Sequence, residues 1–330
     1  MILAGDIGGT NTRLAIFDGT PAQPRAVAVE IFPSGEHNGL REILQGFRAI
    51  HKQPVQAACF GVAGAVVDGK SKPANLPWII DASELASDLG LPAVRLSNDL
   101  EVNAYGIAVL GPNDFVTLNQ GAPDATGNRV LISAGTGLGE AGLFADGQDY
   151  KPWACEGGHT DFGPRDETEI ALLEYLLKRF DHVSVERALS GPGLYNIYQF
   201  LSDTGRAEEP AWLAEKVGTL HPSATISELA MKNESPLCVQ ALDIFVSIYG
   251  AEAGNLALKG MATGGVYIGG GIAPKILPKL QAPEFMRAFT AKGRSTKLLE
   301  AMPVRVILND KTALLGAGRL AMLVRDGLGR

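Results

Sequence analysis

Residues 2–17 read Ile2-Leu3-Ala4-Gly5-Asp6-Ile7-Gly8-Gly9-Thr10-Asn11-Thr12-Arg13-Leu14-Ala15-Ile16-Phe17. This stretch predicts two apolar strands joined by a tight turn, because Gly8 and Gly9 adopt backbone angles that other residues resist. Exposed amides in such a turn can cradle a phosphate group. A carboxylate beside a phosphate needs a cation between them, so Asp6 indicates hydrated Mg²⁺. An ordinary hairpin with a strand-end Asp is the alternative.

The length and composition of the chain bound its class. At 330 residues it is too long for one typical core, so we expect two domains. Hydrophobic residues make up 46% and charged residues 20%, as is typical of a globular enzyme. The formal net charge of −7 argues against a nucleic-acid or anionic-membrane partner, because either would need a basic face. We find no apolar run that predicts a membrane span.

The cysteines and the start of the chain predict the compartment. Cys59, Cys155 and Cys238 are odd in number and widely spaced, so they predict neither a zinc motif nor a disulfide framework. The first predicted strand begins at Ile2, so we expect no signal peptide. Both features favour a reducing cytoplasm.

Strands alternate with helices in the first third of the chain. We expect strands over 27–32, 57–64 and 93–96, and helices over 40–51, 83–89 (capped by Asp81 or Ser83) and 100–109. This alternation favours a largely parallel sheet covered on both faces. Gly111-Pro112-Asn113-Asp114 is the best candidate for a domain boundary.

The opening layout returns beyond this boundary, over residues 129–144. A predicted strand runs into Gly135-Thr136-Gly137, and a second strand follows. The repeated hairpin indicates two similar α/β halves, each with a phosphate-binding turn. Further on we expect helices over 170–179, 243–258 and 312–324 and strands over 266–268 and 304–308, whereas residues 208–234 are hardest to place.

Asn98 and Asp99 end a predicted strand just before a helix. Ligands bind at this position in open α/β sheets. Asp99 can orient a hydroxyl group and accept its proton, as the catalytic-loop Asp of protein kinases does. Capping of the helix by Asp99 is the simpler interpretation, although a helix N-terminus would also hold the carboxylate ionised.

The segment Glu156-Gly157-Gly158-His159-Thr160-Asp161 places four polar side chains around two glycines. The glycines argue against the helix that a two-metal site would need. A polyhydroxyl ligand fits better, because a carboxylate accepts from neighbouring hydroxyls and a neutral imidazole both donates and accepts. A polar surface loop is the alternative.

Two further segments have a structural and a functional interpretation. Glu186 precedes Arg187, and pairing of the two on a solvated face is the simpler interpretation; Gly191 then predicts a helix end and Pro192 a new start. The run Gly269-Gly270-Gly271 follows a buried strand and could let a nucleotide base or ribose lie against the backbone. A tight turn without a ligand is the alternative there.

Six of these segments resemble motifs of the bacterial glucokinase family, within the actin-like sugar-kinase superfamily, and they occur in the same order over nearly the whole chain. Two segments resemble the phosphate-binding motifs of that family: Gly5-Asp6-Ile7-Gly8-Gly9-Thr10-Asn11 and Ala134-Gly135-Thr136-Gly137-Leu138-Gly139. The other four resemblances are Leu96-Ser97-Asn98-Asp99 for the catalytic Asp, Glu156-Gly157-Gly158-His159 and residues 184–194 for the sugar, and Gly269-Gly270-Gly271-Ile272 for adenosine.

This resemblance implies a fold, a reaction and a site. The implied fold is α/β, with two actin-like (ribonuclease H-like) domains around a central cleft: a small domain of residues 1–110 and 310–330, and a large one of 111–309. The implied reaction is ATP-dependent phosphorylation of D-glucose at the 6-hydroxyl, the first step of glycolysis, by a homodimer with Mg²⁺. Asp99 would be the base, and the glucose ligands would be Asn98, Glu156, His159 and Glu186. The ATP contacts would be Gly5, Asp6, Ile7, Gly8, Gly9, Thr10, Gly135, Thr136, Gly137, Gly270 and Gly271, with Asp6 reaching Mg²⁺ through water.

The sequence departs from a related group of sugar kinases at one point, and three other functions remain as alternatives. The Cys-x-Cys-Gly cluster of the zinc-bearing sister group does not follow His159, so we expect this residue to bind sugar and not zinc. The nearest alternative is a kinase for another hexose or an amino sugar, since fold does not fix substrate. A sugar-dependent regulator would need a DNA-binding extension, and the predicted first strand opens the chain. An actin-like ATPase that binds a protein is the third alternative.

Overall fold

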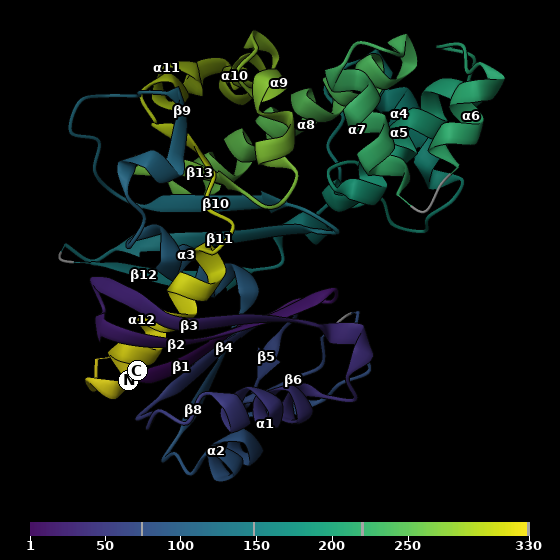
Figure 1. Ribbon diagram of the computed structural model, residues 1–330. Coiled ribbons are helices and arrows are strands. Elements are labelled where there is room, and N and C mark those ends of the chain that lie inside the picture. The colour runs from purple at the N-terminus through teal and green to yellow at the C-terminus, as the bar shows by residue number, and fades with distance from the viewer. Residues whose placement is uncertain (74, 148, 219–220, 329–330) are drawn as a thin grey trace. The chain divides into compact units, whose positions relative to one another are not determined.

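The computed structural model describes residues 1–73, 75–147, 149–218 and 221–328, and its fold is mixed α/β (Figure 1). Contacts divide the chain into two compact units. The first unit holds residues 1–114, 152–154 and 309–330, and the second unit holds 115–151 and 155–308. The predicted domain limits stay a prediction, and residues 329–330 of the predicted small domain lie outside the described residues.

The main sheet of the first unit has five strands in the order β3-β2-β1-β4-β8. Its strands are β1 (Ile2–Ile7), β2 (Asn11–Thr20), β3 (Gln23–Pro33), β4 (Ala58–Val62) and β8 (Val94–Asn98). The predicted hairpin of β1 and β2 is confirmed, with Asp6 opposite Arg13. The expectation of a largely parallel sheet is wrong for this edge: β1, β4 and β8 are parallel, but β2 and β3 are antiparallel because short turns join them.

Helices and a small sheet complete the first unit. They are α1 (Leu40–Ile50), α2 (Ala82–Leu89), α3 (Asp99–Ile107) and α12 (Thr312–Arg325), the strands β5 (Val66–Val67), β6 (Lys70–Ser71) and β7 (Ile80–Asp81), and short 3-10 turns at Ser34–Glu36 and Pro112–Asp114. The apolar side chains of α12, among them Leu314, Ala317 and Leu320, share a buried core with Ile2 and Phe17 of the sheet.

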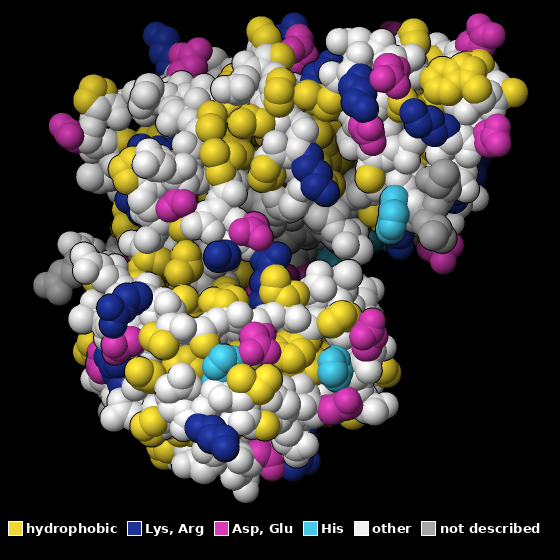
Figure 2. Space-filling view, in the orientation of Figure 1, with side chains coloured by type: hydrophobic (Ala, Val, Ile, Leu, Met, Phe, Trp, Pro, Cys, Tyr) yellow, Lys and Arg dark blue, Asp and Glu magenta, His cyan; other side chains and the backbone are white. Residues whose placement is uncertain are grey.

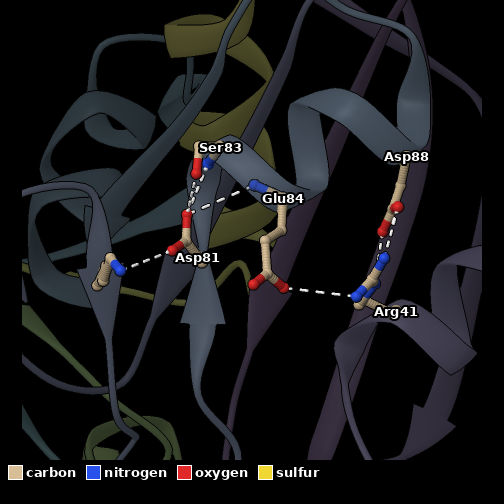
Figure 3. Close-up of polar contacts among 6 residues, drawn as sticks. Arg41, Asp81, Ser83, Glu84 and Asp88 are labelled. Atoms are coloured by element: carbon tan, nitrogen blue, oxygen red, sulfur yellow. Dashed lines mark hydrogen bonds and ion pairs between the residues drawn. The ribbon is translucent and has the colours of Figure 1, made fainter.

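A polar network joins α1 to the start of α2 (Figure 3). Asp81 caps α2 by accepting from the amide and hydroxyl of Ser83, at 2.8 and 2.6 Å, and it pairs with Lys70 at 3.0 Å. The Ser83 hydroxyl and Lys70 hold the pKa of Asp81 below its ordinary value. Arg41 of α1 contacts Glu84 at 3.4 Å and Asp88 at 2.6 Å. Of the two predicted caps, Asp81 is therefore the correct one.

The second unit repeats the arrangement of hairpin and parallel neighbour. Its sheet has the order β12-β11-β10-β13-β14-β9. The strands are β9 (Phe115–Asn119), β10 (Arg129–Ala134), β11 (Leu138–Ala145), β12 (Tyr150–Cys155), β13 (Gly265–Gly269) and β14 (Val304–Ile307). Strands β10 and β11 form the predicted antiparallel hairpin, and β10, β13 and β14 are parallel. The repeated hairpin is therefore confirmed.

Helix α8 (Pro236–Gly260) lies at the centre of the second unit's core. Other helices of the unit are α4 (Glu167–Leu177), α5 (Gly191–Asp203), α6 (Ala211–Val217), α7 (Pro222–Met231), α9 (Leu277–Leu280), α10 (Pro283–Thr290) and α11 (Thr296–Glu300). Four 3-10 turns lie at Gly157–His159, Val185–Arg187, Ala273–Ile276 and Gly293–Ser295.

Two sequence predictions fail in this unit. Gly191 does not end a helix: Ser190 caps α5 through a 3.0 Å bond from the Gly193 amide, and Pro192 lies in the first turn of the same helix. The expectation of no membrane-length apolar run is also wrong, because α8 is long and apolar enough by length and composition alone. However, 72% of its most apolar window is buried inside the unit, as in a core helix.

Candidate functional site

The first hairpin turn is held by its neighbours in the first unit. The Gly8 amide donates to Asn11 O at 3.0 Å, and the Ser34 amide donates to Thr10 O at 2.9 Å. The buried Ser34 hydroxyl donates to Gly8 O at 2.8 Å. Of the predicted ATP contacts here, Gly5 and Ile7 are buried within β1, Gly8 and Gly9 are half-buried, and Thr10 is exposed. The turn is therefore an ordered loop with accessible backbone.

Asp6 precedes this turn and forms no ion pair with another residue that the structure describes. It lies opposite Arg13 on β2 and Gly61 on β4. Burial raises the pKa of the Asp6 carboxyl, and the positive charge of Arg13 opposes that rise. Arg13 itself donates to the carbonyl of Asp310 at 2.6 Å and to its carboxylate at 3.3 Å. A half-buried carboxylate with this partial compensation suits a nearby cation.

The described residues contain no group of three or more His, Cys, Asp or Glu that could hold a metal ion. A closed protein cage for a metal is therefore not formed by this part of the chain. One carboxylate suits Mg²⁺, which keeps several waters and is usually bound through one or two carboxylates and substrate phosphates. Asp6 fits that type of site.

Asn98 and Asp99 lie where β8 meets α3. Asn98 caps the helix: its Oδ1 accepts from the Leu100 amide at 2.8 Å, and its Nδ2 donates to Gly64 O at 3.2 Å. Asp99 is the first helical residue, and its Oδ1 accepts from the same amide at 3.0 Å. The capping role that the sequence left open for Asp99 thus belongs mainly to Asn98. The positive end of α3 favours the ionised carboxylate that a base requires.

The first hairpin turn and Asp99 lie at one edge of the first unit's sheet. Strands β1, β4 and β8 are parallel, with Asp6 beside Gly61 and Gly61 beside Ser97. Two strand spacings separate Asp6 from Ser97, which amounts to about 10 Å between backbones. This is the carboxyl edge of the strands, where α/β sheets bind ligands.

The second hairpin turn lies at an equivalent edge of the second unit. The Gly135 amide donates to Gly137 O at 2.8 Å, and the Gly191 amide at the start of α5 donates to Gly135 O at 2.8 Å. Gly270, with φ +84°, packs so closely that a Cβ there would lie 2.3 Å from Ala134 O. Three of the predicted segments therefore meet: the second turn, the start of α5 and the run 269–271.

A tyrosine that the sequence did not single out holds two of these segments together. The buried Tyr249 hydroxyl donates to Gly269 O at 3.2 Å and accepts from the Ala134 amide at 3.3 Å. Burial raises the pKa of Tyr249 above its ordinary value, so the hydroxyl keeps its proton. A lone tyrosine in an apolar helix was the only sequence signal.

Glu186 contacts the second turn directly. Its Oε2 accepts from the Leu138 amide at 2.8 Å, and a Cβ on Gly137 would lie 2.6 Å from the same oxygen. Arg187 instead stacks its guanidinium over the Phe180 ring at 4.2 Å. Pairing of Glu186 with Arg187 does not occur among the described residues, so the simpler interpretation of the sequence is wrong.

Glu156 precedes the 3-10 turn Gly157–His159, which lies on β11, and His159 is the last residue of that turn. His159 Nε2 is 3.9 Å from Glu156 Oε2, and both side chains are more than half exposed. His159 and Glu186 line the same pocket of about 380 Å³, together with Arg179, Phe180, Asp181, His182, Ser184 and Arg187. The second unit therefore brings together two of the four predicted glucose ligands at one pocket, with Glu156 beside His159.

One other pocket and the distribution of surface charge give no further candidate site. A second pocket, of about 290 Å³, lies between α1 and α2 and is lined by none of the predicted site residues. Figure 2 shows acidic and basic side chains interspersed over the visible face, with no broad basic patch on it.

Comparisons with known proteins agree with one another. The family model for glucokinase matches residues 3–324. A glucokinase from Nostoc sp. is 41% identical over 97% of this chain and 98% of its own length. A crystal structure of a glucokinase from an Antarctic psychrotroph superposes with a TM-score of 0.84 at 29% identity, covering 97% of this chain and 98% of that one.

A more distant structure shares the fold. It is a ROK family glucokinase from Streptomyces griseus in complex with glucose and AMPPNP. The TM-score is 0.65 at 20% identity, with 97% of this chain and 98% of that chain covered.

Proposed function

We propose that this chain, which belongs to the glucokinase family, transfers the γ-phosphoryl group of ATP to the 6-hydroxyl of D-glucose, the first step of glycolysis. The observation that carries the proposal is the 41% identity to the Nostoc glucokinase along nearly the whole of both chains. The glucose and AMPPNP in the related Streptomyces structure support the choice of acceptor and donor. A kinase for another hexose or an amino sugar is the alternative that the same fold allows.

Phosphoryl transfer mainly requires alignment of the reactants and stabilisation of charge. In the proposed mechanism Asp99 orients the 6-hydroxyl and accepts its proton. Its place in the first turn of α3 supports this role. The backbone amides of the two hairpin turns hold the phosphates, and Gly270 and Gly271 lie against the adenosine. Asp6 would hold hydrated Mg²⁺, and the bound ion would offset the negative charge of the phosphates.

We assign the glucose hydroxyls to Asn98, Glu156, His159 and Glu186. The shared pocket of His159 and Glu186 supports this assignment for two of the four. Asn98 already uses its Oδ1 in the helix cap and one amide hydrogen on Gly64, so it has one donor left for a sugar.

The proposal includes the architecture and setting that family membership implies. These are two actin-like domains around a central cleft, a small one of residues 1–110 and 310–330 and a large one of 111–309, in a cytoplasmic homodimer. The three cysteines are all free, which supports a reducing compartment.

A coupled assay of ADP release, run over a panel of hexoses and phosphoryl donors, tests the proposal. We expect ADP release that depends on glucose and ATP. Release without any sugar would identify an ATPase, whereas glucose binding by calorimetry without release would identify a regulator. A higher kcat/KM for another sugar would identify the alternative kinase.

A further inference from the structure

Two carboxyl groups are buried side by side beneath the Glu156–His159 segment. Glu140 of β11 is 1% exposed, and Glu252 of α8 is 5% exposed. Within the described part of the chain, Oε1 of each residue makes no hydrogen bond. Buried polar atoms almost always have a partner, so Glu140 Oε1 requires an explanation, whereas Glu252 Oε1 has Lys259 Nζ at 3.7 Å as an ion-pair partner.

Glu140 is in direct contact with the predicted sugar segment. A Cβ at Gly157 would lie 1.8 Å from Glu140 Oε2, so only glycine allows the backbone to rest on this carboxyl. The Cys155 thiol donates to Glu140 O at 3.5 Å and accepts from the Gly157 amide. The backbone that carries Glu156 and His159 is therefore seated on Glu140.

Glu140 and Glu252 differ in the charged groups that surround them. Lys259 lies 3.7 Å from Glu252 Oε1, and Asn255 donates to Glu252 Oε2 at 2.8 Å. Lys292 reaches the same group by donating to Asn255 Oδ1 at 2.6 Å. Glu252 is thus the member whose surroundings stabilise a negative charge.

Glu140 has no such support. Burial, together with the negative charge of Glu252, raises the pKa of Glu140 to about 7, and the positive charge of Lys259 opposes that rise. The other titratable groups beside the contact are Cys155 and Glu156. Ionised Glu140 would add a second negative charge next to Glu252, in a buried site where charges are weakly screened.

We propose that Glu140 is a positioning residue for sugar binding: its neutral form supports the Gly157 turn, and its ionisation displaces Glu156 and His159 and weakens the affinity for glucose. This inference rests on the proposed function. The base, Asp99, lies on another part of the chain, so the effect falls on glucose KM and not on kcat.

Steady-state kinetics between pH 6 and 8.5 test this inference. For the wild type we expect glucose KM to rise about two- to tenfold across this range, the effect of one weakened hydrogen bond, with a midpoint near pH 7. Glu140→Gln mimics the neutral form, so its KM should stay low and flat. Glu169→Gln, in a buried carboxyl that pairs with Arg165 instead, is the matched control and should keep the wild-type profile.

Three outcomes separate the hypotheses. A wild-type glucose KM that does not change with pH overturns the role of Glu140, whether or not any variant folds. Identical KM profiles for the wild type and a folded Glu140→Gln variant do the same. Absence of glucose phosphorylation in the wild type at every pH would instead overturn the proposed function.

Discussion

The two hairpin turns share one backbone plan but differ in charge. Each turn follows a strand that has an antiparallel neighbour on one side and a parallel neighbour on the other. The penultimate residue of the first strand is Asp6 in one hairpin and Ser133 in the other, and each lies beside a glycine of the parallel neighbour, Gly61 or Gly269. The first strand thus carries a half-buried carboxyl group where the second carries a hydroxyl.

The second turn acquires its carboxylate from elsewhere. Glu186, from the 3-10 turn at Val185–Arg187, bonds to the Leu138 amide. A carboxylate within the strand faces the turn's own ligand, whereas one from a separate segment can also contact a different ligand. The comparison teaches that one backbone plan can carry its carboxylate in two ways, within the strand at Asp6 or from a separate segment at Glu186. Under the proposed function, the first arrangement would serve metal-assisted phosphate binding and the second would join phosphate binding to sugar binding.

Asp99→Asn should have the largest effect on activity, because it removes the proposed base. It tests whether the base lies at the same edge of the first unit's sheet as Asp6. The amide cannot accept a proton, so kcat should fall about 10²–10⁴-fold while glucose still binds. Single-turnover kinetics and calorimetry measure the two quantities. Glu84→Gln, in the first turn of α2, is the matched control and should keep full activity. A near-normal kcat for Asp99→Asn would remove Asp99 from the reaction.

Asp6→Asn and Ser133→Ala test the charge difference directly. We expect the first change to lower kcat about 10–100-fold and to raise the Mg²⁺ concentration needed, with little change in glucose KM. Ser133→Ala should stay within about threefold of the wild type, because no metal is assigned to it. Equal effects of the two variants on kcat would contradict the assigned difference between the turns.

Asp6→Asn should also change stability in the opposite direction from activity. Burial raises the pKa of Asp6, so its ionised form costs free energy of folding, and this cost grows as pH rises above the unfolded value of about 3.9. The variant without ligands should therefore have a Tm at pH 7 equal to or above that of the wild type. The difference should shrink towards pH 4, where both side chains are neutral. A clearly lower Tm at pH 7 would indicate that Asp6 is already well compensated.

Glu186→Gln sharpens the assignment of the second turn. Glutamine can still accept from the Leu138 amide but replaces one acceptor with a donor, so glucose KM should rise about tenfold with the fold intact. Glu156→Gln should act in the same direction. For the wild type, kcat/KM should favour glucose over galactose by about tenfold or more. Unchanged KM in both variants would leave a generic phosphotransferase without these sugar ligands.

The smallest expected effects are losses of unfolding free energy when Ser34 or Ser190, which make hydrogen bonds near the two turns, is replaced. Ser190→Ala removes the cap of α5 and should cost about 1 kcal/mol of unfolding free energy. Ser34→Ala removes the bond to Gly8 O and leaves the buried Thr12 hydroxyl without its 3.0 Å partner, at a cost of about 1–3 kcal/mol. Denaturant unfolding measures both. A larger loss of unfolding free energy for Ser190→Ala than for Ser34→Ala would contradict this expectation.

Helices and strands that depend on glycine placement and on the spacing of apolar residues could be predicted from the sequence. The two hairpins, α1 and α12 follow from glycine placement and apolar spacing, and their predicted limits differ little from the observed ones. The helix start predicted at Pro192 is confirmed to within one residue, and only the helix end predicted at Gly191 is wrong, because α5 already begins at that glycine. The signal that was not used is Ser190, whose side chain caps this start, whereas the proline in the first turn was used.

Contacts between distant segments could not be predicted in the same way. The bond from Leu138 to Glu186 joins residues 48 positions apart, and the sequence favoured Arg187 as the partner of Glu186. Glu140 appeared as one charged residue in an apolar strand, a pattern equally typical of an exposed position. Its burial depends on Gly157 and α8, which come to it only in the folded unit.

Helix α12 has a consequence for biosynthesis. Its side chains cover one face of the sheet built from β1 and β4, yet the ribosome makes it after every residue of the second unit. The strands made first therefore wait with an uncovered apolar face, while the second unit already has its sequence and can fold. A nascent chain stalled before Thr312 would present Ile2, Ala4 and Phe17 to chaperones, and release of α12 would end that exposure.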